Sequence, residues 1–197
     1  RRQPLQRGPG VPVLAMGARA QRLGVLGLVL GLAGPSPARP EVLLTEQAAL
    51  ERAVPGATAQ RRTVYLTPDQ VEAVQKGARS RLPSAMVTVY EAWSSGELLG
   101  RAVLDTSVVR TMPATVLTVI APDGTLKMAL VLQFTEPPDY LPREGWLKTL
   151  EGRALDDDLW PGRGVRRVTG ATLTVQALTD AVRRALVLDA LVLRSTP

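Results

Sequence analysis

The sequence predicts an α+β fold in which an antiparallel sheet packs against helices and a small-residue turn leads into a C-terminal helix. Pro122-Asp123-Gly124 separates two apolar runs, which is typical of an antiparallel hairpin. Over 168–189 a stripe of residues recurs at helical spacing, so one side of a helix is expected to face a core. The positions of this stripe are Val175, Leu178, Val182, Ala185, Leu186 and Asp189.

The first part of the chain, residues 1–39, has the pattern of a secretory signal. Met16 is followed by two arginines, an apolar run over 23–33 and small residues before Arg39. The run is shorter than the roughly 20 residues that span a bilayer, so it favours a signal peptide cleaved near Ala38. An uncleaved amphipathic anchor is the alternative.

The second part, residues 40–84, is predicted as an N-terminal α/β segment. A short helix over 45–53 precedes a strand over 63–66, and Gly56-Ala57-Thr58 is expected in the loop between them. The capping-box sequence Thr67-Pro68-Asp69-Gln70 then opens a second helix, which is expected to stop at Gly77.

The third part, residues 85–197, is predicted as the domain that carries the functional site. A short helix is expected over 143–152, because Trp146 and Leu150 are four residues apart and Gly152 follows. The strands that precede it are expected over 85–93, 98–106, 114–121 and 125–134.

The charge distribution argues against a nucleic-acid partner. The formal net charge is +6, from 24 basic and 18 acidic residues. Residues 1–39 hold six arginines and no acid, so the rest of the chain carries 18 residues of each sign. Nucleic-acid binding needs a basic face, which this balance does not predict.

The chain has no cysteine and no histidine. Disulfides, Cys/His zinc sites, iron–sulfur clusters and catalytic triads with an imidazole base are therefore excluded. The three acids 156–158 lack the spaced oxygen ligands of a calcium loop, so a solvated loop is favoured over a metal site. Any redox role then requires an organic cofactor such as a flavin.

The turn Thr169-Gly170-Ala171-Thr172 opens the C-terminal helix. Gly170 lets the backbone approach a ligand closely, and the free N–H groups of a helix start favour an anion. The string resembles the Ser/Thr-Gly-Ala-Thr motif of the FMN-binding domain family, which includes the flavin subunits of Rnf and sodium-pumping NADH:quinone reductase complexes. An upstream hairpin, a Glu-x-Pro segment and a downstream helix rich in Ala and Val also match the family pattern. A simple turn and helix cap is the alternative.

The resemblance implies that a flavin transferase attaches FMN to Thr172 through a phosphoester. It places Thr169, Gly170, Ala171 and Thr174 around the cofactor. Arg166 stands where the family often has an acidic residue that belongs to the signal read by the transferase. The resemblance therefore implies FMN binding more directly than it implies the covalent bond.

Three further residues are candidates for the cofactor site. Glu136 keeps the glutamate of the family's Glu-Thr-Pro-Gly segment, although this chain reads Glu-Pro-Pro and lacks the glycine; a loop carboxylate is the alternative. Trp146 could form a flat wall for the isoalloxazine ring, as could Tyr140, Phe134 or Trp160, and nothing in the sequence ranks them; an aromatic residue of the core is the alternative. Arg110 could pair with a phosphate or lie on the surface.

The function expected from these features is that of an exported, extracytoplasmic electron carrier. It would hold FMN and exchange electrons with a membrane or periplasmic redox partner, with no protein group acting as an acid or base. A different class of function stays open. Arg166 and the missing glycine are compatible with a non-redox binding or assembly module that keeps the fold and has lost the flavin.

Overall fold

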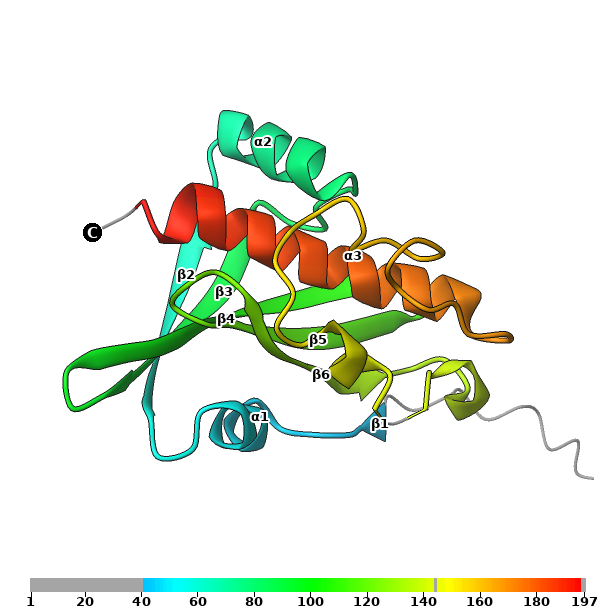
Figure 1. Ribbon diagram of the computed structural model, residues 1–197, viewed down its shortest axis with the longest axis horizontal. Helices are drawn as coiled ribbons and strands as arrows, with labels where there is room; N and C mark the ends of the chain where they lie inside the picture. The colour runs from blue at the N-terminus through cyan, green and yellow to red at the C-terminus, as the bar shows by residue number, and fades with distance from the viewer. Residues whose placement is uncertain (1–40, 144, 196–197) are drawn as a thin grey trace, which may run out of the picture. The chain divides into compact units, whose positions relative to one another are not determined.

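The computed structural model describes residues 41–143 and 145–195, which lie in one compact unit. They form an antiparallel sheet with helices on both faces, which confirms the predicted α+β class (Figure 1). The strands are β1 (Glu41–Val42), β2 (Thr58–Tyr65), β3 (Met86–Ser94), β4 (Glu97–Val108), β5 (Pro113–Ile120) and β6 (Leu126–Phe134). The α-helices are α1 (Glu46–Ala53), α2 (Pro68–Ala78) and α3 (Thr172–Leu188).

The sheet has the strand order β1-β6-β5-β4-β3-β2, so β2 to β6 form a continuous meander. The predicted hairpin between β5 and β6 is antiparallel, with Leu117 opposite Leu130. Its turn is fixed by Asp123, whose carboxylate accepts hydrogen bonds from the N–H and hydroxyl of Thr125, and by Gly124 at φ 93°. Thr58, expected in a loop, instead begins β2, where it lies opposite Trp93.

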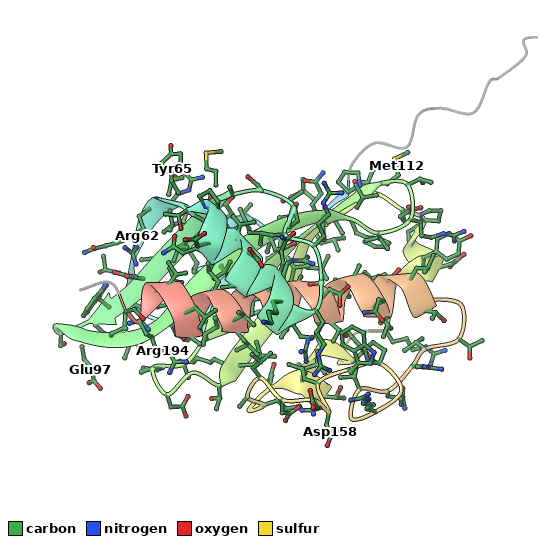
Figure 2. The ribbon with its side chains drawn as sticks, turned by 90° about the horizontal axis from the view of Figure 1, so that it is seen from above. Arg62, Tyr65, Glu97, Met112, Asp158 and Arg194 are labelled. Atoms are coloured by element: carbon green, nitrogen blue, oxygen red, sulfur yellow. The ribbon has the colours of Figure 1, made fainter. Side chains whose placement is uncertain are left out.

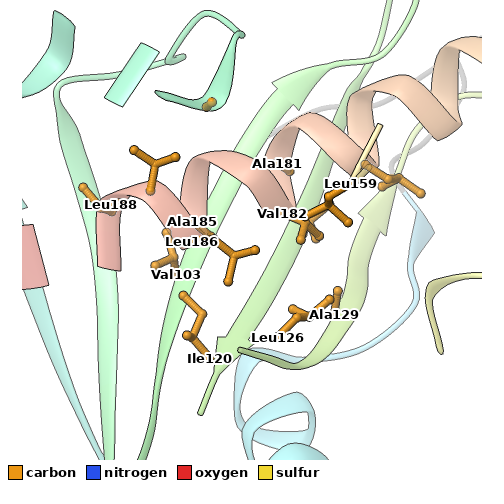
Figure 3. Close-up of a cluster of buried hydrophobic side chains, with 14 of the residues drawn as sticks. Val103, Ile120, Leu126, Ala129, Leu159, Ala181, Val182, Ala185, Leu186 and Leu188 are labelled. Carbon is orange, nitrogen blue, oxygen red and sulfur yellow. The ribbon is translucent and has the colours of Figure 1, made fainter. Parts of the chain in front are cut away.

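Each face of the sheet buries its own hydrophobic core. Alternate residues of a strand point to opposite faces, so Val89 packs toward α3 while its neighbour Tyr90 packs toward α1. The larger core joins the sheet to the predicted stripe of α3, as in the contact of Val182 and Leu186 with Ile120 and its neighbours (Figure 3). All six stripe positions are buried, which confirms the helical pattern.

Helix α2 crosses α3 at Gly77. A Cβ atom at this position would lie 2.9 Å from Cγ1 of Val187, so the absence of a side chain allows the two helices to approach closely. The expectation that Gly77 ends the helix is wrong by one residue: α2 continues to Ala78, and Arg79 ends it with left-handed backbone at φ 54°. The predicted capping box at Thr67 and Gln70 is present.

Charged side chains are buried along α3. Arg184 donates to both carboxylate oxygens of Asp105 on β4, each at 2.8 Å, and both side chains are about 6% exposed. Arg183 donates to backbone carbonyls that include those of Ala78 and Leu159. These contacts fix the rotation of α3 over the sheet, because each needs one particular strand or loop as its partner.

The C-terminal end of α3 continues into a π-helical turn, Asp189–Leu193. Asp189 is fully buried and forms ion pairs with Arg101 at 3.3 Å and Arg194 at 2.9 Å. Burial raises the pKa of Asp189, and the two arginines oppose that rise. The last position of the predicted stripe is therefore a buried ion pair at the end of a hydrophobic helix face.

The predicted helix over 143–152 is mostly absent. Only a 3₁₀ turn, Leu147–Leu150, forms there, with Gly145 at φ 95° before it. The segment is instead held to the edge of β6, because the N–H of Gly152 donates to the carbonyl of Leu126 and the N–H of Leu126 donates to Arg153. Trp146 and Leu150, whose spacing had suggested the helix, are nevertheless buried.

The predicted signal segment lies outside the described residues. Within 41–143 and 145–195, no helix has both the length and the apolar character needed to cross a bilayer.

Candidate functional site

The motif turn places a small exposed loop at the start of α3. Gly170 takes φ 84°, and the N–H of Ala171 closes the turn by donating to the carbonyl of Val168 at 3.1 Å. Thr172 is the first residue of the helix and is exposed, as is Thr169. No side chain caps this helix start. Its first N–H groups, which lack intrahelical partners, are therefore free to bind an external acceptor.

A small cavity opens beside the motif turn. It is lined by residues from three parts of the chain: the β4–β5 loop, the segment after β6, and the start of α3. The guanidinium of Arg110 lies 4.2 Å from the ring centre of Tyr140, so a cation–π contact joins the first two parts. The lining residues are Arg110, Tyr140, Gly170, Ala171, Thr172, Leu173 and Thr174.

Thr174 supplies an unpaired polar atom at this cavity. Its side chain is 1% exposed, and its hydroxyl oxygen has no hydrogen-bond partner among the described residues. A buried hydroxyl without a partner costs free energy, roughly 1–3 kcal/mol. A bound group whose oxygen atoms reached this hydroxyl would remove that cost. The cavity thus combines an unpaired hydroxyl, a cation and a helix start, which together suit an anionic ligand such as a phosphate.

Glu136 lies next to this cavity without lining it. Its Oε1 atom accepts hydrogen bonds from the N–H of Thr111 at 2.7 Å, the N–H of Met112 at 3.0 Å and the hydroxyl of Thr111 at 3.2 Å. The carboxylate is buried and holds the β4–β5 loop in place. It therefore positions Arg110, which precedes Thr111 in that loop.

The Glu136 contacts predict a pH dependence of the loop. The hydrogen bond from the Thr111 N–H is the main cause that lowers the pKa of Glu136 below its usual 4.5, with help from Met112 and the Thr111 hydroxyl. Because the folded-state pKa is lowered, these bonds are complete above the usual value and are lost as the pH falls through the lowered one. In an NMR titration, the Thr111 and Met112 amide signals should move with the Glu136 carboxyl. Glu136→Gln should remove this transition. Amide signals that do not shift at the pH where the Glu136 carboxyl titrates would contradict the predicted pH dependence.

Trp146 lines a second cavity rather than the first. Its indole N–H donates to the carbonyl of Arg166 at 2.9 Å, which ties the segment before the motif to the core. This cavity has an apolar floor from β6, Trp146, Leu147 and Leu178, and a rim that includes Arg143 and Lys148.

The two cavities are neighbours along α3. Thr174 lines the first and Leu178, one helical turn later, lines the second. Tyr140 lines the first and the next residue, Leu141, lines the second. Residues that line the two cavities therefore lie one turn apart on α3, about 6 Å along the helix axis.

The structure brings together five of the eight residues predicted for the site, namely Arg110, Gly170, Ala171, Thr172 and Thr174. Thr169 lies in the same turn. Glu136 holds the β4–β5 loop that carries Arg110, and Trp146 lines the second cavity. Leu173 was not predicted, although its place between two motif threonines could have suggested it. Tyr140 could not be ranked among the aromatic residues without knowing where Arg110 lies.

Two of the three adjacent acids form side-chain contacts within the protein. Asp156 accepts the N–H of Leu159 at 2.6 Å, and Asp157 pairs with Arg79 at 2.6 Å. Among the described residues, no three metal-ligating side chains converge on one point.

Comparison with protein-family models and with curated proteins finds no match for this chain. The residues of the two cavities therefore carry the functional inference.

Proposed function

We propose that this protein is an exported FMN-binding flavoprotein that carries electrons. The observation that carries the proposal is the cavity at the start of α3, which is lined by the exposed Thr172 and by Thr174, whose buried hydroxyl has no partner among the described residues. The phosphate of FMN, linked to Thr172 as a phosphodiester with loss of water, would offer its two non-bridging oxygens as acceptors to the free N–H groups of the helix start, to Thr174 and to Arg110.

The residues present fit FMN in both chemistry and order. Arg110 and the α3 N-terminus would hold the phosphate end, and Gly170 leaves room for close approach because no atom lies within 4 Å of a Cβ built there. The apolar cavity with Trp146 offers the kind of wall that a flat aromatic ring needs. When bound, FMN supplies one- or two-electron chemistry, while the protein binds and orients it.

A carrier is favoured over an enzyme with its own substrate. Among the described residues, Arg110 and Tyr140 are the only titratable ones that line the first cavity, so no described carboxylate is placed there for proton transfer. The chain would therefore exchange electrons with a membrane or periplasmic partner.

A visible absorption spectrum of protein purified from its native host tests the proposal. Bands of a bound flavin are expected. A colourless protein from both the native host and a host with a flavin transferase would favour the second candidate, a non-redox binding or assembly module. Arg166 at the family's acidic position is the observation that favours this alternative.

Export is a separate prediction. Cleavage near Ala38 should give a mature chain that begins near residue 39 and lies outside the cytoplasm, because basic residues, a short apolar run and small residues occur in that order. N-terminal sequencing and cell fractionation measure this. A cytosolic chain that begins at or before Met16 would contradict export and any extracytoplasmic redox role.

A further inference from the structure

Arg194 lies at the C-terminal end of α3 (Figure 2), where it contacts two acidic residues from different parts of the chain. Its Nε atom is 2.9 Å from Oδ2 of Asp189, the first residue of the π-helical turn. Its Nη1 atom donates to the backbone carbonyl of Asp123, and its guanidinium lies so close to the β5–β6 turn that a Cβ atom at Gly124 would collide with it. One side chain therefore ties the π-helical turn to this hairpin.

The carboxylates of Asp189 and Asp123 have opposite surroundings. Asp189 is fully buried, and its Oδ2 atom has no hydrogen-bond partner among the described residues besides the ion pair with Arg194. Burial raises the pKa of Asp189. Asp123 is exposed, and two hydrogen bonds from Thr125 lower its pKa, with a smaller effect from Arg194. Between the two pKa values, Asp189 is protonated while Asp123 is still ionised.

Among the described residues, Arg194 and Arg101 are the charged groups that act on Asp189. Arg101 lies on β4, with its Nη1 atom 3.3 Å from Oδ1 of Asp189, so it also favours the ionised carboxylate, although burial has the larger effect. Glu91, opposite Arg101 on β3, forms an ion pair with Arg62. Helix α2 packs against the π-helical turn, but none of its charged residues contributes to the pKa of Asp189; they are Asp69, Glu72 and Lys76.

We infer that Arg194 is a pH-dependent latch, which holds the π-helical turn through Asp189 when that carboxylate is ionised and transfers to Asp123 when Asp189 takes up a proton. A neutral Asp189 no longer attracts the guanidinium by its charge, whereas the ionised carboxylate beside Gly124 still does. The π-helical turn then loses its tie to the hairpin. Such turns are rare and frequent at functional sites, as suits a segment with two states. The latch does not depend on the proposed flavin.

An NMR pH titration of the whole chain tests the latch. The Arg194 Nε–H signal and the Gly124 amide signal should shift at the pH where the Asp189 carboxyl titrates. Arg194→Gln should raise the pH midpoint of Asp189, because it removes a positive charge that lowers the pKa. Asp123→Asn should leave the release from Asp189 in place and remove the shift of Gly124.

Asp180→Asn is the matched control. Asp180 is another acidic residue of α3 whose pKa is raised by burial, but its carboxylate accepts a hydrogen bond from Gln176 at 2.8 Å. Its replacement should leave the Arg194 shift unchanged, whereas Asp189→Asn should abolish it.

Three outcomes would overturn the inference. These are an Arg194 Nε–H signal that does not follow the Asp189 carboxyl, an Asp189 midpoint that stays the same or falls in Arg194→Gln, and loss of the Arg194 shift in Asp180→Asn. If Asp189→Asn does not fold, the titration of Arg194→Gln decides, because the Arg194 side chain is 37% exposed and its replacement leaves the core intact.

Discussion

Thr172→Ala is expected to abolish covalently held flavin in protein made in a host with a flavin transferase. Thr172 is the exposed first residue of α3, and its hydroxyl is the proposed acceptor of the phosphoester. Wild-type protein should remain fluorescent on a denaturing gel and gain the mass of FMN less one water, whereas the variant should show neither signal. Thr172→Ser retains a hydroxyl and should keep part of the attachment.

Thr58→Ala is the matched control for this experiment. Thr58 ends the other Gly-Ala-Thr string of the chain and is also exposed, but it begins strand β2 instead of a helix. It lacks a helix N-terminus that favours an anion, so its replacement should leave the fluorescence unchanged. Fluorescence that persists in Thr172→Ala would show that another residue is the acceptor.

The same measurement separates FMN binding from covalent attachment, which the arginine at position 166 puts in question. Flavin that copurifies with the wild-type chain but is released on denaturation would mean that the binding site is intact and the transferase signal is not. Arg166→Asp should then increase covalent attachment. The Arg166 contact with Trp146 uses a backbone carbonyl, so this side-chain change leaves it in place.

Arg184→Met is expected to give the largest loss of stability. It would leave the Asp105 carboxylate buried without its bidentate partner, which costs about 3–5 kcal/mol. Arg79→Met breaks an exposed ion pair with Asp157 and should cost less than about 1 kcal/mol. Urea denaturation of the two variants measures the difference in the free energy of unfolding.

A second change, at Asp105, tests whether the loss of stability comes from the unpaired buried carboxylate. Replacing the pair together, as Arg184→Met with Asp105→Leu, should recover most of the loss, because a buried ion pair and a packed apolar pair are often similar in stability. Equal costs for Arg184→Met and Arg79→Met would contradict the importance assigned to the buried pair.

Local patterns predicted the elements of the fold well, since each depends on residues close in sequence. The α3 stripe, the capping box at Thr67 and the Asp123-Gly124 hairpin all occur as expected. The buried Arg183 and Arg184 could not be predicted, because helical periodicity assigns charged residues to the solvent side. Their partners lie on other elements, as Asp105 does on β4.

The site was predictable only in part for the same reason. Thr169 and Thr172 belong to one four-residue motif, so one local pattern found both. The contact between Arg110 and Tyr140 joins residues 30 positions apart and depends on a loop that Glu136 holds by three hydrogen bonds. A carboxylate that acts on the backbone of a distant loop leaves no periodic signal. Likewise, Gly77 looked like a helix stop because its contact with Val187 is visible only when α2 and α3 are packed.

The position of α3 after the meander in the sequence has a consequence for the order in which the two can form. The meander β2 to β6 needs only neighbouring strands and can pair progressively, but its larger core stays open until residues 175–193 cover it. Helix α2 also needs α3 as a packing partner, since Gly77 lies against Val187. Thr172 is the first residue of that same helix. Because the proposed acceptor sits where the core is completed, attached flavin would serve as a marker of chains that have finished folding.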